Sequence, residues 1–123
     1  MKKILIAEDD PITQKLVNAI VSKMGLIPFI SPNGRHALET LQANGDFSLL
    51  ITDIMMPEMD GKQLIQAVRN DRHYHEMPVI IMSAFVGVKE ISEFLKTGAT
   101  FFQPKPIDKK KFEEHILKCL ERI

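Results

Sequence analysis

Short apolar runs alternate with amphipathic stretches along the whole chain. The apolar runs cover residues 4–7, 26–30, 48–52, 78–82 and 99–103 and show little alternation of polar and apolar positions. Such runs are typical of strands that are buried on both faces of a parallel sheet. In the stretches between them, apolar residues recur every three or four positions, as on one face of a helix. The pattern predicts five alternations of strand and helix.

Capping and turn residues mark where these helices begin and end. Asp10 followed by Pro11 is typical of a helix start, because the Asp side chain caps free amides and proline fits the first helical position. Gly25 ends this helix, and its predicted inward positions are Ile12, Leu16, Ala19, Ile20 and Met24. Further helices are predicted after the turn at 31–34, after the loop that ends at Gly61, and over about 88–97 and 109–122.

Parallel strands joined by helices form a sheet that is covered on both faces. Right-handed crossovers then give a doubly wound, flavodoxin-like α/β fold with three layers. At this length we expect the strand order 2-1-3-4-5. Pro28 in the second run lacks an amide donor and suits an edge strand. In this order the carboxyl ends of the first and third strands flank the switch point where ligands bind.

Composition narrows the class of protein. The chain has 123 residues, 45% of them hydrophobic, which fits one soluble domain over residues 1–123. Lys+Arg and Asp+Glu both number 16, so nothing indicates direct binding to nucleic acid. The single cysteine, Cys119, excludes an internal disulfide and fits a reducing compartment. The apolar run at 4–7 is too short for a signal peptide or a membrane span. We therefore expect a cytoplasmic domain.

Residues with useful chemistry stand at the ends of four of the five predicted strands. Glu8 and Asp9 follow the first, Asp53 the third, Ser83 the fourth and Lys105 the fifth. Because the carboxyl ends of parallel strands lie at one edge of a sheet, we expect these residues on one rim. Three carboxylates repel one another unless a cation compensates them. They are the hard oxygen ligands that Mg²⁺ prefers, and this ion often binds a phosphate as well.

The two remaining groups indicate the anion. The Ser83 hydroxyl and the Lys105 ammonium suit the oxygens of a phosphoryl group. The acceptor would be a carboxylate oxygen of Asp53, which would form an acyl phosphate. Lys105 stands between two prolines, which fix the local backbone. Although this fold can bind a flavin, none is expected in this chain, because the acidic residues at 8–10 would repel the flavin phosphate.

These residues resemble the receiver domain of two-component response regulators, the family of the chemotaxis receiver protein. The resemblance covers the whole chain, and its motifs stand in register with one another. They are the acidic pair Glu8-Asp9, D-I-M-M-P-E-M-D-G from Asp53, V-I-I-M-S-A from Val79, and K-P at Lys105-Pro106.

The resemblance implies that Asp53 accepts a phosphoryl group from a phosphohistidine on a histidine kinase or a histidine phosphotransfer protein. It also implies Mg²⁺, with Mn²⁺ as the alternative ion. Asp9, Asp53 and the backbone carbonyl of Met55 would be direct metal ligands, and Glu8 would act through a water molecule. The chain would phosphorylate and dephosphorylate itself without turning over an external substrate.

The resemblance further implies a switch. Ser83 and Lys105 would contact the phosphoryl oxygens, and Phe102 occupies the switch aromatic position. When Ser83 moves toward the phosphate, the ring of Phe102 would swing inward. This movement would reshape the face made by the fourth helix, the fifth strand and the fifth helix, where a downstream protein would bind. Phe102 has no hydroxyl, so an output contact that depends on a Tyr hydroxyl is absent.

Two other classes of function compete with this interpretation. A hydrolase that uses an aspartyl phosphate, as in haloacid-dehalogenase-like phosphatases, would want a second Asp two residues after the nucleophile, where Met55 stands. Such an enzyme would also want a cap for substrate selection. A phosphate-independent interaction module would not need the five rim residues that this chain retains. The sequence leaves open whether the chain acts alone or is part of a longer regulator or hybrid kinase.

The four histidines are interpreted as structural. His73 and His75 could form a transition-metal pair, but a solvated loop is the preferred interpretation. His36 and His115 fall on predicted helices and have no evident partners in the sequence.

Overall fold

The computed structural model describes residues 2–84 and 87–121, in which five strands alternate with five helices. The strands are β1 (Lys3–Ala7), β2 (Ile27–Ser31), β3 (Phe47–Asp53), β4 (Val79–Ser83) and β5 (Phe101–Pro104). The helices are α1 (Pro11–Lys23), α2 (Gly34–Asn44), α3 (Gly61–Asn70), α4 (Val88–Thr97) and α5 (Lys109–Glu121). Among the residues described, no helix is both long and apolar enough to cross a bilayer.

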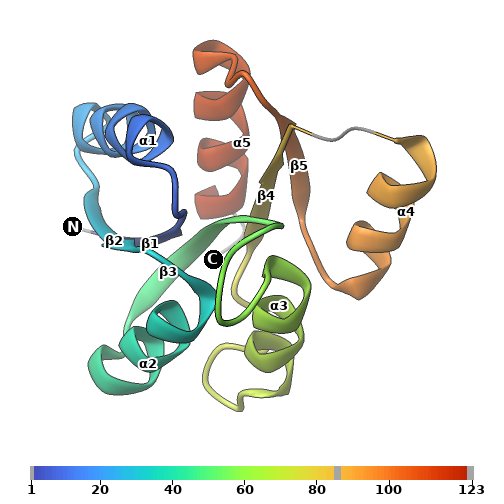
Figure 1. Ribbon diagram of the computed structural model, residues 1–123. Helices are drawn as coiled ribbons and strands as arrows, with labels where there is room; N and C mark the ends of the chain where they lie inside the picture. The colour runs from blue at the N-terminus through green and yellow to red at the C-terminus, as the bar shows by residue number, and fades with distance from the viewer. Residues whose placement is uncertain (1, 85–86, 122–123) are drawn as a thin grey trace.

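All five strands are parallel and lie in the order β2-β1-β3-β4-β5. Figure 1 shows α1 and α5 on one face of the sheet and α2, α3 and α4 on the other. The predicted doubly wound, flavodoxin-like fold and its strand order are therefore confirmed. β2 lies at an edge of the sheet, as Pro28 indicated, and β1 and β3 are central neighbours.

The core consists of two layers, one on each face of the sheet. Successive side chains of a strand point to opposite faces, so Leu5 packs toward α2 and α3 while Ile4 and Ile6 pack toward α1 and α5. All three side chains are fully buried. This double burial explains why the strands read as continuous apolar runs. The carboxyl ends of the strands meet at one edge of these layers.

Side-chain caps fix where the helices near this edge begin. The Asp10 carboxylate accepts hydrogen bonds from the Thr13 amide at 3.0 Å and the Thr13 hydroxyl at 2.7 Å, which lower the pKa of Asp10. Asp60 caps α3 in a reciprocal arrangement with Gln63. Both predicted start signals at Asp10 and Gly61 therefore coincide with observed helix ends.

The predicted inward face of α1 is partly wrong. Ile12 is 79% exposed and Leu16 is 43% exposed, whereas Val17, Ile20 and Val21 are buried against the sheet. Val17, Ile20 and Val21 share one side of the helix at 100° per residue, and Leu16 lies at the flank of that side rather than toward the sheet. Apolar residues of α1 extend around the helix over more than one face, and packing buries the face that carries the β-branched residues.

Two further predictions need correction. His36 and His115 do have partners: His36 Nδ1 lies 2.8 Å from the Ser31 hydroxyl, and His115 Nδ1 lies 3.1 Å from Gln103 Oε1. The His115 ring also stacks on Phe101, with ring centroids 4.5 Å apart. Burial lowers the pKa of His115, because desolvation disfavours its charged form.

Helix α4 packs more loosely than its neighbours. It has no buried residue, although each of α1, α2, α3 and α5 has at least three in the part of the chain that is described. Phe94 is its half-buried contribution to the core on the α3 side. Val88 is 87% exposed and Leu95 is 43% exposed.

Candidate functional site

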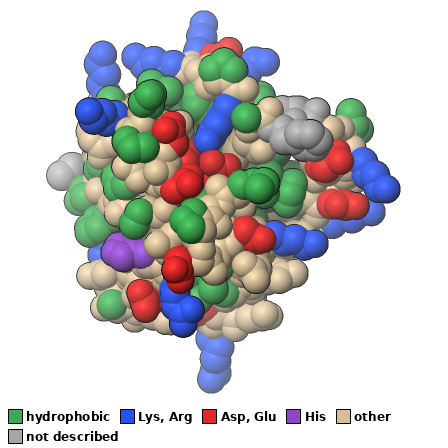
Figure 2. All heavy atoms as spheres, viewed as in Figure 1, with side chains coloured by type: hydrophobic (Ala, Val, Ile, Leu, Met, Phe, Trp, Pro, Cys, Tyr) green, Lys and Arg blue, Asp and Glu red, His purple; other side chains and the backbone are tan. Residues whose placement is uncertain are grey.

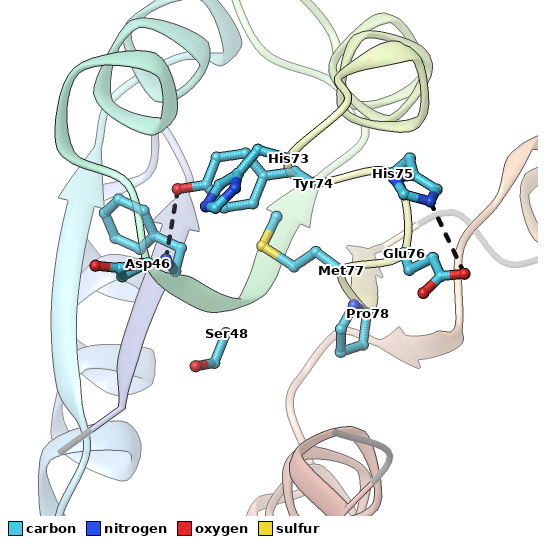
Figure 3. Close-up of a pocket in the computed structure, with 9 residues that line it drawn as sticks. Asp46, Ser48, His73, Tyr74, His75, Glu76, Met77 and Pro78 are labelled. Atoms are coloured by element: carbon cyan, nitrogen blue, oxygen red, sulfur yellow. Dashed lines mark hydrogen bonds and ion pairs between the residues drawn. The ribbon is translucent and has the colours of Figure 1, made fainter.

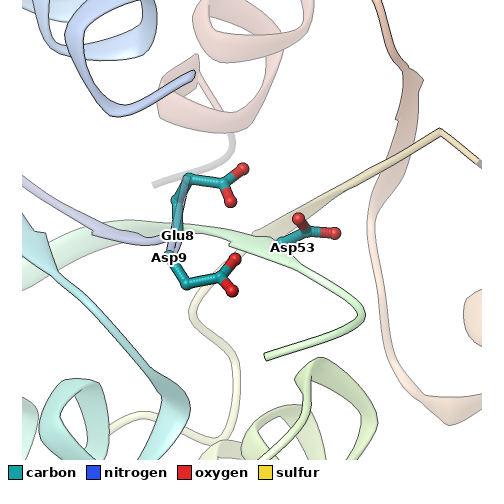
Figure 4. Close-up of side chains that lie close together, drawn as sticks. All are labelled: Glu8, Asp9 and Asp53. Atoms are coloured by element: carbon teal, nitrogen blue, oxygen red, sulfur yellow. The ribbon is translucent and has the colours of Figure 1, made fainter. Parts of the chain in front are cut away.

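Three carboxylates meet where the two central strands end. Glu8 and Asp9 directly follow β1, and Asp53 is the last residue of β3 rather than the residue after it. One oxygen from each of the three lies within 4.8 Å of the others, and Figure 4 shows the side chains grouped at this edge. Glu8 is fully buried, Asp53 is 8% exposed and Asp9 is exposed. We call this group the acidic pocket.

A single lysine bridges two of these carboxylates. Lys105 Nζ lies 2.7 Å from Asp53 Oδ2 and 2.8 Å from Glu8 Oε1. Lys105 reaches the pocket from the connection between β5 and α5, and its backbone amide donates to the Ser83 carbonyl at 2.8 Å. The peptide bond between Lys105 and Pro106 is cis. The predicted convergence of the rim residues is therefore seen for these four residues.

Burial and charge act together in the acidic pocket. Burial raises the pKa of Glu8, and the nearby Asp53 charge adds to this, although hydrogen bonds from Lys105 and the Asp10 amide oppose it. For Lys105, burial by itself would lower the pKa, but hydrogen bonds and charges from Asp53 and Glu8 outweigh burial and raise it. The lysine is therefore held in its charged form at neutral pH.

Every polar group of Glu8 is engaged. Its amide donates to the Ser31 carbonyl at 3.0 Å, and its own carbonyl accepts from Gln14 Nε2 at 2.5 Å. The two carboxylate oxygens bond Lys105 and, at 3.1 Å, the Asp10 amide. Glu8 is therefore a fixed, buried negative charge rather than a mobile side chain.

The loop that follows Asp53 is packed tightly against its own strand. Asp53 Oδ1 accepts from the Ile54 amide at 2.7 Å, and the Gly61 amide donates to the Ile54 carbonyl at 2.7 Å. A Cβ at Gly61 would overlap the Asp53 carbonyl oxygen, and a Cβ at Gly34 would overlap the Met59 carbonyl oxygen. Glycine is needed at both positions because backbone approaches backbone.

The remaining predicted residues lie on β4, on β5 and in the loop after Asp53. Ser83 ends β4 and is 4% exposed. Phe102 lies on β5, half-buried, and packs against the core on the α4 side. The Met55 side chain is 78% exposed just beyond Asp53. Gln14 was not among the predicted residues, and its place four residues after the Asp10 cap is the only sequence signal that it faces the end of β1.

The molecule presents this edge to solvent as an acidic centre. Figure 2 shows acidic side chains gathered in the middle of the face, with basic side chains beside them. Lys+Arg and Asp+Glu both number 16 over the whole chain, so the concentration of negative charge in the acidic pocket is local. A local negative field of this kind attracts cations.

The histidines of the loop between α3 and β4 do not form a second site. They border a cavity of about 440 Å³ at the opposite ends of β3 and β4. Figure 3 shows the His73 ring against Tyr74, whereas His75 points toward Glu76, 3.8 Å away. The two imidazoles therefore do not converge, and in the described part of the chain the potential metal-binding cluster is the acidic pocket.

The comparison with known families decides the assignment. The family described as "Response regulator receiver domain" matches residues 4–117. The chain belongs to the response regulator receiver family. Receivers of this family are typically not enzymes in their own right, and they act in two-component signalling. The acidic pocket of this receiver is consistent with a phosphoacceptor site, and such a cluster is typical of the Mg²⁺ site of receivers.

Relatives of this receiver include single-domain and multidomain proteins. It is 31% identical over 115 residues to Chemotaxis protein CheY1 of Helicobacter pylori, covering 93% of each chain. It is 29% identical over 119 residues to Sensor histidine kinase GacS of Pseudomonas protegens, covering 94% of this chain but 13% of that protein.

Solved receiver structures agree with the fold. The Francisella response regulator 1452 receiver domain has a TM-score of 0.91 at 25% identity and covers 99% of this chain and 98% of its own. Chemotaxis protein CheY4 of Vibrio cholerae has a TM-score of 0.84 at 28% identity, with coverages of 100% and 98%.

Proposed function

We propose that this receiver takes up a phosphoryl group on Asp53 and acts as a switch in a two-component relay. The donor would be a phosphohistidine on a histidine kinase or on a histidine phosphotransfer protein. The observation that carries this proposal is the Lys105 ammonium, held between Asp53 and Glu8 with the Asp9 carboxylate alongside. This arrangement gives an acceptor oxygen, a fixed positive charge and a potential cation site within one small space.

The chemistry is a transfer from nitrogen to oxygen. A carboxylate oxygen of Asp53 would attack the phosphorus atom while the bond between phosphorus and the donor imidazole nitrogen breaks. The phosphoryl group becomes an acyl phosphate on Asp53, and the electron pair of the broken bond stays on the imidazole. Lys105, 2.7 Å from Asp53, would pair with the phosphoryl oxygens, and the Ser83 hydroxyl would donate to another of them.

The donor set of the acidic pocket fits Mg²⁺, or Mn²⁺ as the alternative. Its three carboxylates offer closely spaced hard oxygens, and Asp9 is open to solvent. Asp9, Asp53 and the Met55 backbone carbonyl would hold the ion, and the fully buried Glu8 would act through water. When bound, the ion supplies positive charge that stabilises the phosphoryl oxygens during transfer.

The signal would leave the site through β5. The Lys105 amide bonds the Ser83 carbonyl, so the two residues that contact phosphate are linked across the ends of β4 and β5. A shift of Ser83 toward the phosphate would let the half-buried Phe102 ring turn inward. This would reshape the surface formed by α4, β5 and α5, which we propose as the binding face for a downstream protein.

The proposed domain spans residues 1–123 and turns over no external substrate. Protein partners are proposed rather than nucleic acid, because basic and acidic residues balance at 16 each. The similarity to a segment of a sensor histidine kinase supports a phosphohistidine as donor, since that relative belongs to the same kind of relay.

The test is phosphorylation by a small donor. The protein is incubated with Mg²⁺ and acetyl phosphate, and its intact mass is followed. We expect the mass of one phosphoryl group to appear and to be lost after base treatment, as for an acyl phosphate. Asp53→Asn should abolish the gain. Asp60→Asn is the matched control, because it makes the same change at a helix cap outside the pocket and Asn also caps helices.

Three results would each exclude one part of the proposal. A phosphoryl gain that survives Asp53→Asn would exclude Asp53 as the acceptor. Uptake that continues after Mg²⁺ is chelated would exclude the metal role of the acidic pocket. Amide chemical shifts of α4, β5 and α5 that stay unchanged on phosphorylation would exclude the proposed output face.

A further inference from the structure

A glutamine in the first turn of α1 contacts the backbone of the acidic pocket. Gln14 Nε2 donates to the carbonyl oxygen of Glu8 at 2.5 Å. Gln14 is half-buried, and its hydrogen bond spans the bend between β1 and α1. The bond is not needed to start the helix, because the Asp10 carboxylate already caps α1 through Thr13. We therefore expect this hydrogen bond to fix the conformation of the bend between β1 and α1.

The bend carries Asp9, the solvent-exposed carboxylate of the acidic pocket. Within the described residues, no hydrogen bond or ion pair holds the Asp9 carboxylate, so its direction depends on its backbone. The peptide unit between Glu8 and Asp9 is planar, so the orientation of the Glu8 carbonyl also sets the orientation of the Asp9 amide and α-carbon. The Glu8 amide is fixed to Ser31 on one side of this unit, and Gln14 fixes the carbonyl.

We infer that Gln14 is a positioning residue that orients Asp9 for a divalent cation. This inference rests on the proposed function, because it assigns a further residue to the same site. Groups that orient metal ligands without touching the metal typically change metal affinity roughly 10- to 100-fold when they are removed. Gln14 acts through one backbone bond only, so we expect an effect at or just below the low end of that range, roughly fivefold to tenfold.

The experiment compares Mg²⁺ binding by the unphosphorylated full chain and its variants. Gln14→Met keeps the length of the side chain and removes the donor. The matched control is Asn18→Leu, which removes an amide group from an exposed position one turn further along α1. Mg²⁺ is titrated while the backbone amide shifts around the acidic pocket are followed by NMR. We expect the dissociation constant of Gln14→Met to rise roughly fivefold to tenfold and that of Asn18→Leu to stay within about twofold.

A second measurement separates positioning from a loss of structure. Thermal unfolding without Mg²⁺ records stability, and phosphorylation by acetyl phosphate is measured over a range of Mg²⁺ concentrations. For Gln14→Met we expect slow uptake at low Mg²⁺ and uptake close to the wild-type rate at saturating Mg²⁺. A slow rate that persists at saturation would mean that Gln14 does not act through cation binding.

The outcomes distinguish a failure of the positioning role of Gln14 from a failure of the proposed function. If Gln14→Met lowers the melting temperature but binds Mg²⁺ as tightly as the wild type, Gln14 is only structural and the inference is wrong. If the wild type binds Mg²⁺ and Gln14→Met binds it more weakly, but neither takes up phosphate, the positioning role holds and the proposed function fails. If the wild type does not bind Mg²⁺, both are wrong.

Discussion

Replacing Lys105 with methionine is the sharpest test of how the acidic pocket is balanced. The substitution keeps most of the apolar stem and removes the charge that lies 2.7 Å from Asp53 and 2.8 Å from Glu8. The two carboxylates then face each other without a cation, and the Glu8 carboxylate is fully buried. We expect the free energy of unfolding to fall, because an unpaired charge is left in a site with little water.

The size of the loss can be bounded from the structure. Breaking a buried ion pair from one side typically costs about 3–5 kcal/mol. The Lys105 side chain is 18% exposed, which favours the lower value. The protein can also escape by protonating Glu8, whose ordinary pKa is 4.5. At pH 7 that protonation costs about 3.4 kcal/mol, since each pH unit is worth about 1.4 kcal/mol. We therefore expect a loss of about 3 kcal/mol at pH 7.

The same bound predicts the pH dependence of this loss. The cost of protonating Glu8 falls to about 2 kcal/mol at pH 6 and to below about 1 kcal/mol at pH 5. The destabilisation caused by Lys105→Met should shrink in step. In the wild type, folding raises the pKa of Lys105 above its ordinary value of 10.5. Its stabilising contribution is thus complete below pH 10.5 and is lost as the pH rises through the raised pKa.

Urea unfolding followed by circular dichroism at pH 5, 6 and 7, without divalent ions, gives these free energies. Lys111→Met is the matched control, because Lys111 is an exposed lysine in the first turn of α5 and should change stability by less than about 0.5 kcal/mol. A loss below about 1 kcal/mol at pH 7, or an equal loss at pH 5 and pH 7, would refute the charge argument. Added Mg²⁺ should stabilise Lys105→Met more than the wild type.

Two further predictions concern parts of the fold that support the site. Arg69→Met should lower the free energy of unfolding, measured by urea titration, by about 2–4 kcal/mol. The Arg69 guanidinium donates to the Gly98 carbonyl at 2.6 Å and to the Met77 carbonyl at 2.7 Å, and both carbonyls would lose a charged partner. A change below about 0.5 kcal/mol would show that water replaces the guanidinium at no cost. Gly61→Ala should destabilise by about 1–3 kcal/mol and slow phosphorylation, because the added Cβ overlaps the Asp53 carbonyl oxygen and must displace the loop. Wild-type rates of phosphoryl uptake in Gly61→Ala would contradict the claim that this loop positions the acceptor.

The fold could be predicted from the sequence because local signals agreed with one another. The apolar runs, the cap at Asp10 and the glycines at positions 25 and 61 all stand where the structure has element boundaries, within a few residues. The inward face of α1 could not be predicted in the same way. Leu16 and Val17 are both apolar, and which one faces the sheet is decided by packing between segments that are distant in the sequence.

The candidate site was likewise predictable only in part. Which residues lie on the rim follows from strand ends, which are local features. How they bond does not, because Glu8 and Lys105 are 97 positions apart and their pairing exists only once the sheet has formed. The partners of His115 and the role of Gln14 were missed for this reason: a neutral side chain that bonds a backbone carbonyl or a buried amide has no distinctive sequence pattern.

The loose packing of α4 has a consequence for the energetics of the native state. A helix without fully buried side chains can open locally at a small fraction of the global free energy of unfolding. Hydrogen exchange should therefore find the α4 amides among the least protected helical amides of the chain and those of β1 and β3 among the most protected. Coupling between two sites in a protein is typically about 1–3 kcal/mol. A perturbation of that size is therefore large enough to shift the conformational equilibrium of α4 while the sheet beneath it stays intact.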